Sequence, residues 1–183
     1  MTEPLQAITA RMSVPEGQYA VSGTGTGPDA DTAIPCPDSI DPTGLMAAGT
    51  DGALVITGAD YEEITLTVQL WDTPPPLELT PWSDCVEDSY TATGQVYLHD
   101  VEGRTPRNLP DLAFAGPGSY RFRLSVRGRD EAAFGAEDAE NEAPGSCAEE
   151  HLLQIWPAAP APAVSHKLTD QVGAEWRRSS AER

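Results

Sequence analysis

The sequence predicts an all-β fold, an antiparallel β-sandwich of about seven to eight short strands with long acidic loops and a short C-terminal helix or tail. Apolar and polar residues alternate in several short segments, which is typical of strands with one buried face. The chain of 183 residues contains 16 Gly and 17 Pro, and this excess favours many turns over long helices. Before residue 165 no segment has the residue spacing of a strong amphipathic helix.

The first 71 residues contain four segments with the composition of strands. Residues 5–12 alternate imperfectly and predict a first strand with a bulge or an edge strand, and residues 18–21 predict a short second strand. Residues 53–57 and 63–71 flank a turn and predict a hairpin. The inward parity of its second strand holds Ile64, Leu66, Val68 and Leu70, whereas the outward parity holds Thr65, Thr67, Gln69 and Trp71.

The middle of the chain predicts a crossing segment, a strand and a long connection. Residues 81–86 read as the crossing segment, and we expect Trp82 to close an open end of the core rather than to form a ligand platform. Residues 94–100 alternate and predict another strand, with Val96 and Leu98 facing inward. The connection over residues 101–118 is rich in Pro, Asn and Gly.

Residues 117–130 contain the clearest strand pattern. One parity holds Tyr120, Phe122, Leu124 and Val126, and the other holds Arg121, Arg123, Ser125 and Arg127. Because successive side chains of a strand point to opposite faces, one face is apolar and the other is rich in arginine. We therefore place this strand in the middle of a sheet, with its arginine face in contact with water.

The C-terminal part predicts a loop, a strand, a linker and a tail. Residues 130–150 are acidic and predict a long mobile loop, and residues 149–157 predict the last strand. We expect a β-sandwich domain at residues 1–157, a Pro/Ala linker at 158–164, and a short amphipathic helix or flexible tail at 165–183. The apolar stripe of that helix comprises Leu168, Val172 and Trp176, after Ser165 as its cap.

The charge of the chain limits its partners. The formal net charge is −18, which repels nucleic acid and anionic membranes and either serves solubility alone or attracts a basic protein. The start of the chain has no basic segment followed by an apolar run, so we expect a cytoplasmic protein that does not enter a membrane. The odd number of cysteines fits a reduced compartment, with a Cys36–Cys85 or Cys85–Cys147 bridge as the alternative.

The sequence contains no recognisable catalytic or metal-binding motif. His99 and His151 stand at strand ends beside carboxylates, and we expect solvated side chains there rather than a metal site. The Asp-rich residues 28–50 lack the spacing of a calcium loop and predict a solvated loop. No Gly-x-Ser-x-Gly motif is present. We therefore expect no enzyme, no catalytic residue, no metal and no cofactor.

Partner contacts are expected at the arginines and at the C-terminal stripe. The arginines are explained either by cross-strand pairs with acidic residues or by contact with an acidic group of a partner, because a guanidinium binds carboxylates in bidentate fashion. The expected partner-binding residues are Arg121, Arg123, Arg127, Arg129, Trp71, Leu168, Val172 and Trp176.

The second half of the chain resembles a known family. The resemblance lies in a Pro-Gly-x-Tyr-x-x-Arg strand and a Glu-x-x-Leu-x-x-Trp-Pro strand, separated by a variable acidic loop. The matching residues are Pro117, Gly118, Tyr120, Arg123, Glu150, Leu153, Trp156 and Pro157. This pattern is similar to the competence protein J family of small β-sandwich nuclease inhibitors and to uncharacterised actinobacterial proteins of the same outline. The resemblance implies a protein that binds and restrains another protein without catalysis.

Three functions remain open at this point. The first is an inhibitor-like or immunity-like module that restrains a basic partner, such as a nuclease or toxin. The second is a structural or assembly component that docks through its C-terminal tail. The third is a calcium- or carbohydrate-binding module that uses Trp71 or Trp82 with the Asp-rich loop.

Overall fold

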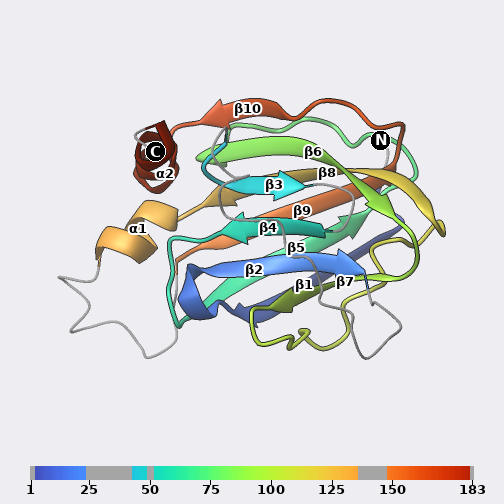
Figure 1. Ribbon diagram of the computed structural model, residues 1–183, viewed down its shortest axis with the longest axis horizontal. Helices are drawn as coiled ribbons and strands as arrows, with labels where there is room; N and C mark the ends of the chain where they lie inside the picture. Colours follow the sequence, from blue (N-terminus) through green and yellow to red (C-terminus); the bar gives the residue numbers. More distant parts are fainter. Residues whose placement is uncertain (1–2, 24–42, 49–51, 136–147, 182–183) are drawn as a thin grey trace.

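The computed structural model describes residues 3–23, 43–48, 52–135 and 148–181, which fold into ten strands and few helices (Figure 1). The all-β prediction is confirmed. The strands are β1 (Gln6–Ser13), β2 (Gln18–Gly23), β3 (Met46–Ala48), β4 (Gly52–Ile56), β5 (Glu63–Leu70), β6 (Asp84–Ala92), β7 (Val96–Asp100), β8 (Gly118–Arg127), β9 (Glu150–Pro157) and β10 (Val164–Leu168). The helices are α1 (Arg129–Phe134), α2 (Gln171–Ala181) and a single 3-10 turn at Pro15–Gly17. None of the helices in this described part is long and apolar enough to cross a membrane.

The larger sheet has the strand order β1-β5-β9-β8-β6-β10. Strand β8 lies inside this sheet and β1 lies at its edge, as predicted. All neighbours are antiparallel except β5 and β9, which are parallel, so the expectation of a purely antiparallel arrangement is wrong. A parallel pair needs a long crossover, and three further strands lie between β5 and β9 in the sequence.

The smaller sheet has the order β3-β4-β2-β7, and it corrects the predicted hairpin. Strands β4 and β5 form where expected, but they belong to different sheets and do not pair. The reason is visible in β4, which is buried along its whole length rather than on alternate residues. Its second face packs with Leu54 and Ile56 against Trp176 of α2.

One hydrophobic core fills the space between the two sheets. The larger sheet contributes Leu66, Val68, Phe122 and Leu124, and the smaller sheet contributes Tyr19, Val21, Val55 and Leu98. Burial of each such apolar side chain stabilises the fold by about 1.5–3 kcal/mol. The alternating residues of β5 and β8 face this core as predicted. Trp71, expected on the outward side, does not belong to this core, but it is buried rather than exposed to water.

Three strands were missed: β3, which lies in the expected loop at residues 28–50, β6 and β10. Residues 81–86 were expected to cross the core, yet β6 pairs with β8 along nine residue positions. Strand β10 pairs with β6 at the sheet edge and begins within the expected linker. Leu168 therefore lies in β10 and not on a helix, and α2 begins only at Gln171. Figure 1 shows α1 and α2 side by side at one end of the sheets.

The acidic loops lie mostly outside the described residues. Helix α1 occupies the first residues of the expected 130–150 loop, and residues 136–147 are not described. The same holds for residues 24–42, which include most of the Asp-rich segment, and for Cys36 and Cys147. Cys85 is a buried free thiol.

Candidate functional site

The arginine face of β8 is paired inside the protein rather than exposed. Arg121 and Arg123 retain only 4% and 6% of their surface, which contradicts the expected contact with water. Both bind Glu87 of the neighbouring strand β6: Arg121 Nη2 lies 2.9 Å from Glu87 Oε1, and Arg123 Nε lies 3.1 Å from Oε2. The alternative of cross-strand pairing with acidic residues is confirmed.

The same two arginines attach two proline-rich segments to the outer face of the larger sheet. Arg123 Nη1 donates to the carbonyls of Pro75 and Pro76 at 3.0 and 3.3 Å. Arg121 Nη1 donates to the Ala161 carbonyl at 2.7 Å. Proline offers a carbonyl acceptor without an N–H donor, and the guanidinium carries five donors, so the two groups complement each other. These arginines are therefore used by the fold itself.

Glu87 is the centre of this cluster. Burial alone would raise the pKa of the Glu87 carboxyl, but hydrogen bonds from Arg121 and His166 and the charges of both arginines lower it below its ordinary value of 4.5. A carboxyl with a lowered folded pKa stabilises the fold above its unfolded pKa, and that contribution is lost as the pH falls through the folded pKa. Glu87 should therefore contribute to stability at neutral and weakly acidic pH and above, and this contribution should be lost in strongly acidic solution.

We expect Glu87→Gln to lower the free energy of unfolding by about 2–3 kcal/mol at pH 7, because two buried guanidinium groups lose their counter-charge. The loss should shrink at about pH 3, where Glu87 of the parent chain also becomes neutral. Urea unfolding at both pH values measures it. Glu150→Gln is the matched control, since Glu150 pairs with half-exposed Arg127 and should cost less than about 1 kcal/mol. Equal losses in the two variants would contradict the assignment.

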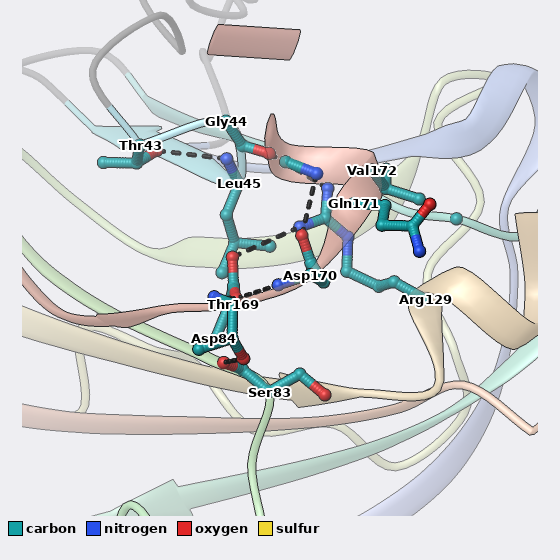
Figure 2. A network of polar contacts seen from close by, with 12 residues as sticks. Thr43, Gly44, Leu45, Ser83, Asp84, Arg129, Thr169, Asp170, Gln171 and Val172 are labelled. Carbon is teal, nitrogen blue, oxygen red and sulfur yellow. Dashed lines mark hydrogen bonds and ion pairs between the residues drawn. The ribbon is translucent and has the colours of Figure 1, made fainter. Parts of the chain in front are cut away.

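Arg129 forms a second buried cluster, shown in Figure 2. Its side chain is fully buried at the start of α1. Arg129 Nη1 lies 2.9 Å from Asp170 Oδ2, Nη2 donates to the Gly44 carbonyl at 2.9 Å, and Asp84 Oδ2 lies 3.9 Å away. The cluster thus connects four parts of the chain: helix α1, strand β6, the segment just before β3 and the segment just before α2.

Asp84 joins the C-terminal segment to this cluster. Its Oδ1 accepts hydrogen bonds from the backbone N–H groups of Thr169 and Asp170, at 2.5 and 2.9 Å. Burial, followed by the nearby Asp170 carboxylate, raises the pKa of Asp84. Close backbone packing completes the contact: Gly44 has φ +65°, and a Cβ there would lie 2.3 Å from the Gly173 carbonyl oxygen of α2.

A third buried group joins the two sheets. His151 Nε2 lies 2.7 Å from Glu149 Oε1, and His151 Nδ1 lies 2.9 Å from the hydroxyl of Tyr19. Glu149 also accepts the N–H groups of Gly58 and Ala59. His151 is buried, so the expectation of a solvated histidine is wrong here. The side chains of Tyr19, His151 and Glu149 are almost fully buried.

The other expected site residues are spread over the molecule. His99 is half-buried, and its Nε2 atom lies 2.6 Å from the hydroxyl oxygen of Ser22. No group of three His, Cys, Asp or Glu side chains in the described part of the chain is arranged to hold a metal ion. Trp82 is half-buried on the outer face of the larger sheet, beside Arg127, so it does not close the core. Val172 and Trp176 of α2 pack on the protein's own body, and Leu168 packs from β10.

The turn between β4 and β5 presents an exposed aromatic side chain. Tyr61 is 71% exposed, and its backbone has φ +56°, which is unfavourable for a bulky residue. The turn is held in place because Tyr61 N donates to the Val14 carbonyl at 3.1 Å and Val14 N donates to the Glu62 carbonyl at 2.9 Å. Exposed acidic residues adjoin Tyr61 in the chain: Asp60, Glu62 and Glu63. Tyr61 was not predicted as a site residue, because a single tyrosine in a turn has no sequence pattern.

Comparison with known proteins identifies the fold. No protein-family model matches the sequence, and no curated protein matches it. Among solved structures, the chain is similar to ComJ from Bacillus subtilis, an inhibitor of the DNA degrading activity of NucA, with 12% identity and a TM-score of 0.50 over 86% of this chain and 99% of ComJ. It is also similar to crocagin biosynthetic gene J, with 13% identity and a TM-score of 0.45 over 85% and 100% of the two chains. The ComJ match supports the fold that the family resemblance implied, and at such low identity it concerns the fold alone.

Proposed function

We propose that this chain is a non-catalytic, cytoplasmic β-sandwich module that binds and restrains a basic partner protein, in the manner of an inhibitor or immunity protein. The observation that carries the proposal is the ComJ-like fold, because ComJ inhibits the DNA degrading activity of NucA. The buried polar clusters support a binding role over catalysis. Each of them is enclosed and stabilises the contact between segments of the chain.

The charge of the protein supports a basic partner. At a net charge of −18 the chain attracts cationic surfaces over a distance, which speeds association and makes it sensitive to salt. A nuclease or another protein that acts on nucleic acid carries such a surface, because it must bind phosphates. Arg121, Arg123 and Arg129 are buried and are therefore poor candidates for direct contact with a partner, so the contact surface has to include exposed residues outside this set.

The turn around Tyr61 fits the requirements of that surface best. Exposed tyrosines are frequent anchors of protein interfaces, and acidic neighbours match a basic partner. The turn is held by backbone hydrogen bonds to Val14, so the aromatic ring is presented from a fixed backbone. A residue with an unfavourable backbone angle costs stability. Such a residue is expected at an exposed position where the side chain is needed for binding rather than for folding.

Capture of a partner at low salt tests the function. We expect the immobilised full chain to retain a basic protein from an extract of its source organism, and the purified chain to inhibit DNA degradation by that extract. Both effects should weaken at high salt. Tyr61→Gly is the matched control for unspecific attraction, because it keeps the net charge. Absence of both capture and inhibition, or full retention of both by Tyr61→Gly and by an unrelated protein of equal charge, would reject the proposal.

A further inference from the structure

A groove of about 420 Å³ lies on the outer face of the larger sheet, between strands β5, β8 and β9 and the segment that follows β5. Its size falls in the range of small-molecule sites. It is lined by Pro4, Gln69, Trp71, Pro76, Glu78, Trp82, Ser125, Leu152 and Gln154. This lining is much smaller than the roughly 20–30 residues that one side of a stable protein interface contains.

The aromatic wall of the groove includes Trp82, whose ring contacts a cation. The guanidinium of Arg127 lies 5.4 Å from the ring centroid of Trp82, over one face of the indole. Arg127 is itself held by Glu150, at 2.7 Å. One face of Trp82 is therefore in contact with the Arg127 guanidinium, and as a lining residue Trp82 contributes apolar surface to the groove.

The polar lining contains two amide side chains, those of Gln69 and Gln154, which are hydrogen-bonded to each other. Trp71 Nε1 and Gln154 Nε2 both approach Gln69 Oε1, at 3.1 and 2.9 Å. An indole N–H can only donate, so the Gln69 atom that it contacts must be the amide oxygen. The Gln154 atom that contacts the same oxygen must then be the amide nitrogen. Within the described part of the chain, Gln69 Nε2 and Gln154 Oε1 have no protein partner. These two atoms remain for a ligand.

We propose that this groove binds a neutral saccharide of two or three rings. Neighbouring sugar hydroxyls donate and accept at once, which matches the remaining donor of Gln69 and acceptor of Gln154. The apolar C–H face of a sugar ring suits the indole of Trp82. Among the described residues that line the groove, Glu78 is charged and none is Lys or Arg, and Arg127 beside Trp82 is already paired with Glu150. Phosphorylated, sulfated or uronic sugars therefore lack a free counter-charge. The site is independent of the partner surface at Tyr61.

Titration of the full chain with maltotriose, cellotriose and N-acetylchitotriose, followed by tryptophan fluorescence, tests the site. We expect a saturable change with at least one of them at millimolar concentration. Gln154→Leu and Trp82→Ala should each weaken that binding by about tenfold or more. Phe134→Ala removes another exposed aromatic side chain and should leave it unchanged. A thermal melt of each variant separates lost binding from lost folding.

Four outcomes would overturn the proposal. These are no saturable change with any of the three neutral sugars, unchanged binding in a folded Gln154→Leu variant, equal binding of a trigalacturonate, and a response only to a proline-rich peptide. The last outcome would assign the groove to a segment of another protein.

Discussion

Replacing Arg129 by methionine should lower the free energy of unfolding by about 3–5 kcal/mol at pH 7. Methionine fills much of the space of the arginine stem, so the loss reports the charge rather than a cavity. Asp84 and Asp170, both buried, would lose the cation that now lies 2.9 Å from Asp170. Urea unfolding of the full chain measures the effect.

The pH dependence of this loss has a defined sign. Burial already raises the pKa of Asp84, and removing Arg129 raises it further, because the arginine charge favours the ionised carboxylate. A carboxyl with a raised folded pKa destabilises the fold above that pKa, and the penalty disappears as the pH falls. The Arg129→Met variant should therefore approach the parent chain in stability under acidic conditions.

Two further variants test whether the Arg129→Met variant loses stability because the buried carboxylates lack their cation. Asp84→Asn in the Arg129→Met background should restore part of the stability, because the asparagine oxygen still accepts from Thr169 and Asp170. Arg127→Met, which removes a half-exposed arginine with one ion pair, should cost less than about 1 kcal/mol. If Arg129→Met costs no more than Arg127→Met, the cluster does not hold the C-terminal segment as described.

Strand prediction succeeded where only one face of a strand is apolar. In β5, β7 and β8 the alternation of apolar and polar residues specifies both the strand and its inward face. In β6 the buried residue Asp84 and the half-buried Asp88 stand on the same parity as Val86 and Tyr90, and these charges hid the pattern. For β4 no alternation exists, so its pairing partner could not be chosen between the two sheets.

Prediction of the site failed for a different reason. Alternation correctly placed Arg121 and Arg123 on the face opposite Phe122, but it does not reveal whether further segments cover that face. The covering contacts join residues far apart in sequence, such as Arg123 with Pro75 and Arg121 with Ala161. In the same way, Arg129 and Asp170 stand 41 positions apart, and no local spacing links them.

The largest functional effect is expected from Tyr61→Gly. We expect it to weaken binding of the captured partner by about 2 kcal/mol, roughly 30-fold, because an exposed aromatic anchor is lost. The same change should leave the fold as stable or raise its free energy of unfolding by up to about 1 kcal/mol, since glycine adopts a positive φ freely. Calorimetric titration and urea unfolding measure the two quantities.

Opposite signs of the two effects are what distinguish a binding residue from a structural one. If Tyr61 served the fold, its replacement would lower the free energy of unfolding of the protein. Partner affinity would then fall only in proportion to the fraction of unfolded protein. Tyr61→Phe keeps the ring and the unfavourable φ, so it should retain most of the affinity without the gain in stability. Because neither variant alters the net charge of −18, the salt dependence of binding should stay unchanged in both. A destabilised Tyr61→Gly variant with undiminished affinity would move the partner surface away from this turn.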